Sequence, residues 1–84
     1  MDDREDDYQE NQVVIYREHD SILKVRILEN YSNEEKVAYK MRVEEIMNPN
    51  SRRKVDVGVE FDCEKPKRQF YAGRWYLEAL VENK

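Results

Sequence analysis

The sequence predicts an all-β fold, and three observations point to this class. Apolar and polar residues alternate with a period of two along most of the chain, as in half-buried strands. The alternating segments are rich in β-branched and aromatic residues, which suit a pleated sheet. Clusters of Asn, Ser, Pro and Gly separate the segments and are typical of turns. The 84-residue chain is therefore expected to fold as several short antiparallel strands.

Five segments show this alternation, at residues 13–17, 22–28, 37–43, 55–61 and 75–81. In the first segment Val13 and Ile15 share one face, although Val14 and Tyr16 make the other face apolar too. In the other four segments an apolar face alternates with a face that is largely polar, although Tyr76 and Leu80 lie on the second face of 75–81. The predicted core consists of Val13, Ile15, Leu23, Val25, Ile27, Val37, Tyr39, Met41, Val43, Val57, Val59, Phe61, Trp75, Leu77 and Ala79.

Residues 33–47 allow a second interpretation. The run from Ser32 to Glu35 matches a helix capping box, and Asn48-Pro49 would end a helix that started there. The α+β alternative therefore makes 33–47 helical. At 100° per residue, however, the apolar side chains of this segment scatter around the whole helix, whereas at 180° they separate onto one face. The periodicity favours a strand.

Short turns at 19–21, 31–34 and 48–51, and a longer loop at 64–74, connect the five predicted strands as a meander. An open sheet of this size would leave unpaired edges and a half-covered apolar face. We therefore expect the meander to close into an SH3-like barrel. Gly58 lies on the polar face of the fourth segment, where it predicts a bulge or a bend.

Charge is concentrated at the beginning of the chain. Residues 1–10 contain six acidic side chains and one base, while the formal net charge of the whole chain is −4. Such a stretch buries little apolar area and repels itself. The predicted organisation is a disordered acidic tail at 1–10, either solubilising or regulatory, followed by a single β-barrel domain at 11–84.

The residue inventory argues against an enzyme. The chain has one histidine, His19, in a predicted turn, and one cysteine, Cys63, in phase with Phe61 on the apolar face. No glycine-rich phosphate loop and no zinc or calcium ligand pattern is present, so no cofactor and no metal site are expected. The absence of a long apolar run and of a secretory signal predicts no membrane partner and a cytoplasmic location.

Residues 65–76 differ from the rest of the chain. They contain four bases, no acid and four of the nine aromatic residues. Basic side chains interleaved with aromatics can hold an anionic group and supply contact area, although the aromatics can equally be core residues that close the barrel. The predicted ligand-binding residues are Arg68, Phe70, Tyr71, Arg74, Trp75 and Tyr76.

Two functions follow from this pattern. The first is a non-catalytic interaction module that binds a protein or peptide partner, in line with the near-neutral barrel and the lack of catalytic residues. The alternative is a weak single-stranded nucleic-acid-binding domain that uses 65–76, which the overall acidity disfavours because net negative charge repels phosphate. The sequence does not indicate the oligomeric state.

Overall fold

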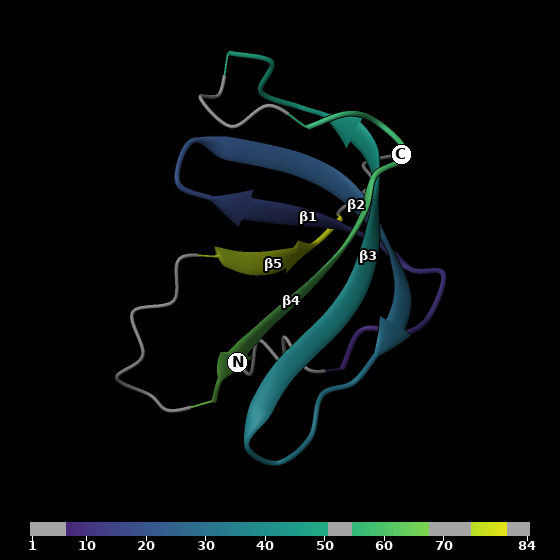
Figure 1. Ribbon diagram of the computed structural model, residues 1–84, viewed down its shortest axis with the longest axis vertical. Helices are drawn as coiled ribbons and strands as arrows, with labels where there is room; N and C mark the ends of the chain where they lie inside the picture. Colours follow the sequence, from purple (N-terminus) through teal and green to yellow (C-terminus); the bar gives the residue numbers. More distant parts are fainter. Residues whose placement is uncertain (1–6, 51–54, 68–74, 81–84) are drawn as a thin grey trace.

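A computed structural model describes residues 7–50, 55–67 and 75–80 of the chain (Figure 1). These residues form one curled antiparallel sheet, and no helix occurs among them. The predicted all-β class is confirmed, and the helical alternative for 33–47 is wrong because a strand occupies that segment. The strands are β1 (Val13–Glu18), β2 (Ser21–Asn30), β3 (Lys36–Ile46), β4 (Glu60–Pro66) and β5 (Trp75–Ala79).

The order of strands across the sheet is β4-β3-β2-β1-β5. The first four strands form a meander, and β5 then returns to pair with β1 on the far side. The sheet curls into a half-barrel, consistent with a small SH3-like barrel (Figure 1). Its two edge strands, β4 and β5, approach each other, and the side chain of Lys65 on β4 contacts Trp75 on β5.

The first hairpin turns over only two residues. Glu18 pairs with Ser21, and His19 between them has a φ of 54°, in the left-handed region. Two-residue hairpin turns require positive φ because only then does the turn match the right-handed twist of the strands. The tight turn predicted at 19–21 is therefore present.

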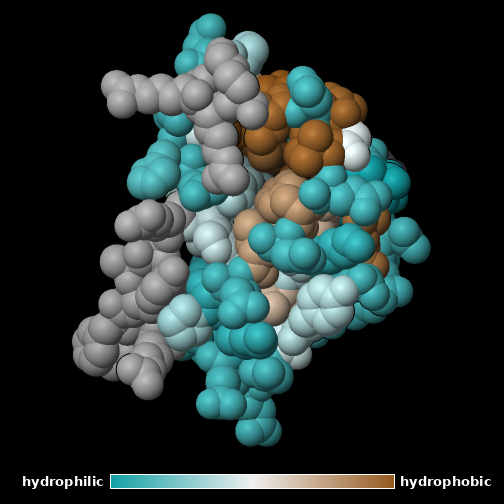
Figure 2. All heavy atoms as spheres, in the orientation of Figure 1, coloured by the Kyte–Doolittle hydropathy of each residue, from teal (hydrophilic) through white to brown (hydrophobic). Residues whose placement is uncertain are grey.

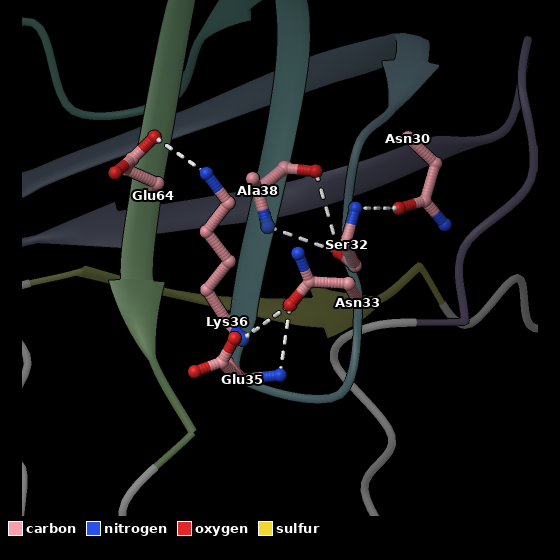
Figure 3. A network of polar contacts seen from close by, with 7 residues as sticks. All are labelled: Asn30, Ser32, Asn33, Glu35, Lys36, Ala38 and Glu64. Carbon is pink, nitrogen blue, oxygen red and sulfur yellow. Dashed lines mark hydrogen bonds and ion pairs between the residues drawn. The ribbon is translucent and has the colours of Figure 1, made fainter.

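The connection between β2 and β3 explains why a capping-box sequence did not start a helix (Figure 3). The side-chain oxygen of Asn33 accepts hydrogen bonds from the backbone N–H groups of Glu35 (2.8 Å) and Lys36 (3.0 Å). The hydroxyl of Ser32 accepts a bond from the N–H of Ala38 (2.9 Å). Such local side-chain bonds serve a loop as well as a helix start. The apolar and polar residues that alternate from Lys36 onward then form a strand of the sheet.

The core lies on the concave face of the sheet. Two register irregularities in the β2–β3 pairing, between Lys24 and Val25 and between Ile27 and Glu29, contribute to the bend, because bulges increase local twist and curvature. The buried cluster consists of Val14, Tyr16, Leu23, Val25, Ile27, Val37, Tyr39, Met41, Val43, Trp75 and Leu77.

The core face of β1 differs from the prediction. Val14 and Tyr16 point into the buried cluster, so their neighbours Val13 and Ile15 lie on the opposite face. Ile15 is nevertheless buried, while Val13 is only half-buried. Tyr16 takes the inner position because its ring fills the space between Phe61 (centroids 5.3 Å apart) and Trp75 (5.9 Å). Alternation alone could not choose between two apolar faces.

The fourth strand begins later than predicted, at Glu60 instead of residue 55. Gly58 has a φ of 94°, and the N–H of Val59 donates to the carbonyl of Asp56 (3.2 Å). Asp56–Val59 is thus a turn with glycine at the position that needs positive φ. Gly58 marks a bend, as predicted, but Val57 and Val59 on either side of it are exposed rather than in the core. Ala79, also predicted as core, is exposed.

The segment before β1 contacts the barrel. The ring of Tyr8 lies 6.2 Å from that of Tyr39, and its backbone N–H donates to the Tyr39 hydroxyl (3.1 Å). Asn30 donates from its side chain to the carbonyl of Tyr8 (3.1 Å). Residues 1–6 lie outside the described part, so the predicted tail at 1–10 and domain at 11–84 stay predictions. Within the described residues, no helix is long and apolar enough to cross a membrane.

Candidate functional site

The predicted binding segment is only partly described. Trp75 and Tyr76 are placed at the start of β5, whereas Arg68, Phe70, Tyr71 and Arg74 lie outside the described residues. Trp75 and Tyr76 are adjacent in a strand, so their side chains point to opposite faces of the sheet. Trp75 is 6% exposed and Tyr76 is 47% exposed. These two aromatics therefore do not form one stacking surface.

Trp75 is a core residue that closes the gap between the edge strands. Its ring stacks on Tyr16 at 5.9 Å with an interplanar angle of 20°. The ammonium of Lys65 lies 4.7 Å from the centre of the indole ring and donates a hydrogen bond to the Trp75 carbonyl (2.9 Å). A cation over an indole face is attracted by the ring quadrupole. Lys65 thus serves as an internal contact between β4 and β5.

Cys63 belongs to a hydrogen-bonded row on the inner face. The hydroxyl of Tyr16 donates to a carboxylate oxygen of Glu18 at 2.6 Å, which uses its only proton. The contact between the Tyr16 hydroxyl and the Cys63 sulfur is longer, at 3.6 Å. Burial, together with the bond to Glu18, raises the pKa of the Tyr16 hydroxyl. Nucleophilic cysteine chemistry needs an accessible thiolate, whereas Cys63 is half-buried and packs against the core cluster.

The described residues contain no group of three or more His, Cys, Asp or Glu side chains arranged to hold a metal ion. His19 lies in the β1–β2 turn and Cys63 lies on β4, and neither belongs to such a group among these residues. A structural zinc site needs about four ligands gathered in a tetrahedron.

A different surface is prominent in the structure. Three exposed hydrophobic side chains occupy one end of the sheet: Met47 (46% exposed), Val57 (62%) and Val59 (41%). Met47 follows the end of β3 and the two valines precede β4, and these positions lie at the same end because β3 and β4 are antiparallel. The half-buried Ile46 and Val55 pack against the core beside them. We call Met47, Val57 and Val59 the apolar patch.

Figure 2 shows hydrophobic side chains gathered at the top of the molecule, where the end of β3 and the segment before β4 lie in Figure 1. The turn at Gly58 holds this segment against β3, because the N–H of Gly58 and the carbonyl of Val59 both bond to Val43 (2.8 and 2.9 Å). The valine side chains are therefore presented from a hydrogen-bonded backbone. Contiguous exposed apolar patches larger than roughly a few hundred Å² are rare on monomeric proteins and often mark an interaction site.

Alternation alone does not predict the apolar patch, because Val55, Val57, Val59 and Phe61 continue a regular period of two. The signal that could have found it is Gly58. A glycine inside an alternating run often marks a break in the strand, and a break before residue 60 removes the valines from the sheet.

No family model, curated protein or solved structure matches this chain.

Proposed function

We propose that the chain is a non-catalytic protein-interaction module that binds its partner through the apolar patch. The observation that carries this proposal is the clustering of exposed hydrophobic side chains. Of the five large hydrophobic side chains exposed in the described part of the chain, three belong to the patch. The other two, Tyr31 and Tyr76, lie in the β2–β3 connection and on β5.

Covering the patch would supply binding free energy. Complete burial of a valine or methionine side chain stabilises by roughly 1.5–3 kcal/mol relative to full exposure, so these half-exposed residues would each contribute about 1 kcal/mol. Residues around such a centre then add specificity more than affinity. A protein surface with a complementary apolar ridge is the partner that this patch fits.

The described part of the 65–76 segment gives less support to the nucleic-acid alternative. Base stacking needs an exposed aromatic face, and the indole of Trp75 is covered by Tyr16 and Lys65. The ammonium of Lys65 is already bonded to a carbonyl within the domain. The negative net charge of the chain also opposes phosphate binding.

Site-specific photo-crosslinking tests the proposed function. A benzophenone amino acid at Val57 or, as the control site, at Tyr76 is irradiated in extract of the source cells. We expect a discrete protein adduct from position 57 that excess unlabelled wild-type protein suppresses. The competitor with Val59→Asp should suppress the adduct at least tenfold less well, whereas Tyr76→Asp should compete like the wild type.

The experiment distinguishes the apolar patch from the surface around Tyr76. If the adduct forms at position 76 and not at 57, or if Tyr76→Asp is the competitor that fails, the apolar patch is not the binding surface. If position 57 gives no protein adduct and the chain instead captures RNA from the same extract, the protein-interaction proposal is wrong. Val59→Asp should keep the fold because the side chain is already exposed, and a near-ultraviolet circular dichroism spectrum checks this.

A further inference from the structure

Among the described residues, β4 is an edge strand of the sheet. It pairs with β3 on one side only. The carbonyl of Val59 and the N–H of Lys67 both bond to β3 or the residue before it, at 2.9 Å each. Hydrogen-bonding direction alternates along a strand, so residues with odd numbers face β3. The N–H and carbonyl groups of Glu60, Asp62 and Glu64 therefore point away from the sheet.

Within the described part of the chain, no backbone hydrogen bond is seen at these outward groups, and all three residues are exposed. An edge of this kind is a template on which another strand can pair. The series of outward backbone groups ends at Pro66, which also faces away from β3 but has no N–H group. The length of edge that can accept a strand is therefore the Glu60–Glu64 stretch.

The side chains along this edge have one sign of charge. Glu60, Asp62 and Glu64 all place carboxylates on the convex face. Lys36 reaches Glu64 at 3.4 Å and Lys40 reaches Glu60 at 4.0 Å, both from the β3 side and both exposed to solvent. Exposed pairs of this kind are weak, so the carboxylates remain available to a cation that approaches from the open side.

The carboxylates of Glu60, Asp62 and Glu64 determine which kind of strand can pair with β4, a second copy of β4 or a strand from a different protein. If two β4 edges paired, carboxylates would lie opposite carboxylates, and like charges directly across a ladder are destabilising. Charged edges are a common protection against edge-to-edge association. A strand with basic side chains at alternate positions would instead meet each carboxylate with an opposite charge.

The inner face of β4 determines which side chains fit at the other positions of an added strand. Phe61 and Cys63 are half-buried and pack against the core cluster from β4. Residues of an added strand alternate in the same way as those of β4. The positions between the basic residues would therefore lie beside Phe61 and Cys63, where apolar side chains fit.

The other edge of the sheet is less open. β5 is the second edge strand, and its Trp75 carbonyl already accepts a hydrogen bond from the ammonium of Lys65 at 2.9 Å. A strand adding to β5 at that point would have to displace this bond and the contact of Lys65 with the indole. The same contact limits the β4 edge at Lys65, so the open stretch of β4 among the described residues is Glu60–Glu64.

We propose that the edge of β4 binds an extended peptide segment, with alternating basic and apolar residues, by strand addition. Backbone bonds to Glu60, Asp62 and Glu64 supply affinity, and the carboxylate row selects basic side chains. This inference rests on the proposed function, because it names the class of protein segment that the module takes. The edge begins next to Val59, so it is continuous with the apolar patch.

The probe is a short capped peptide in which lysine alternates with valine, titrated into ¹⁵N-labelled full-length protein at low salt. We expect the largest amide shifts at Glu60, Asp62 and Glu64, and slower hydrogen exchange at these amides. A peptide with glutamate in place of lysine should not bind. A lysine–valine peptide methylated on alternate backbone nitrogens should lose at least tenfold in affinity, because it keeps the charges and loses the strand bonds.

Asp62→Pro is the sharpest variant. Proline removes an outward N–H without removing a bond to β3, and edge strands tolerate proline at such positions. We expect it to weaken peptide binding at least tenfold while the Cys63 amide, which faces β3, stays protected from exchange. Asp62→Lys should weaken binding similarly through charge, whereas Glu10→Lys, an equal change at an exposed residue before β1, should weaken binding less than twofold.

Three results would overturn strand addition: an unchanged affinity in Asp62→Pro, equal binding of the methylated peptide, or no amide shift at β4 with any lysine–valine peptide. If Asp62→Pro fails to fold, the methylated peptide and Asp62→Lys decide the matter. The crosslinking experiment at Val57 does not depend on these results. A protein adduct there, together with no β4 response, would retain the proposed function and reject this inference.

Discussion

The central strands and the edge strand β4 are built from the same alternation, but they are buried to different degrees. On β2 the inner side chains Leu23, Val25 and Ile27 are at most 4% exposed. On β4 no residue is fully buried, and the pattern alternates between half-buried and exposed. Among the described strands, β2 has hydrogen-bonded neighbours on both sides, whereas β4 has only one. Position within the sheet, more than local sequence, sets the burial.

The central strands and the edge strand therefore contribute differently to stability and to binding. The centre supplies most of the apolar area removed from water, which is the main source of stability. The edge supplies less, so its surface can be exposed for binding at small cost to the fold. Substitutions at the centre should therefore change stability, and substitutions at the edge should change binding.

The largest expected effect comes from the same substitution made in both regions. Val25→Ala should destabilise by about 2–3 kcal/mol, because it deletes buried methyl groups and leaves a cavity. Val59→Ala, at a side chain that is 41% exposed, should cost below about 1 kcal/mol. Urea denaturation of the two variants and the wild type measures both values.

Equal losses of stability in Val25→Ala and Val59→Ala would break the comparison, since they would mean that the segment before β4 contributes as much as the centre. Competition in the crosslinking experiment measures the effect of Val59→Ala on binding. Val59→Ala should compete less well than the wild type despite its near-normal stability.

The turn that starts the edge strand should show an intermediate effect. Gly58→Ala should destabilise by roughly 1–2 kcal/mol, because an L-residue is strained at a φ of 94°. No atom lies within 4 Å of the added Cβ, so the cost is one of backbone conformation and not of crowding. Thermal denaturation measures it, and Asp56→Ala in the same turn is the control. An unchanged melting temperature for Gly58→Ala would contradict the turn geometry.

The smallest expected effect concerns the outer face of the centre. Glu44 on β3 accepts hydrogen bonds from Arg26 and Arg42, both at 3.4 Å. The bond from Arg26, and secondarily that from Arg42, lowers the pKa of the Glu44 carboxyl. A carboxyl with a lowered folded-state pKa stabilises above its unfolded-state pKa, and this stabilisation is lost as pH falls through the folded-state value.

Glu44→Gln should therefore be slightly less stable than the wild type at neutral pH, and the difference should disappear in acid. Urea midpoints across the acid range test this, with the exposed Glu10→Gln as the control. The carboxylate is solvent-accessible, so the effect is small. A difference that grows as the pH falls would contradict the assigned partners.

The fold could be predicted further than the binding surface. Alternation located β1, β2, β3 and β5, including β3, where Ser32 and Asn33 offered a competing helix start, but the fourth predicted segment shares only Glu60 and Phe61 with β4. The apolar patch was not predicted, because Val57 and Val59 satisfy the same pattern as true core residues. Of the predicted ligand-binding residues, the structure places Trp75 in the core and Tyr76 on the surface.

Taken alone, the sequence determined the class of fold and the inner faces of β2 and β3, because a period of two allows only one apolar side there. Only the tertiary structure determined which of the two apolar faces of β1 is buried in the core. It chose Val14 and Tyr16 over Val13 and Ile15, because only Tyr16 meets Phe61 and Trp75 across the curled sheet. It also decided which edges stay open, since burial and pairing depend on neighbouring strands that lie far away in the chain.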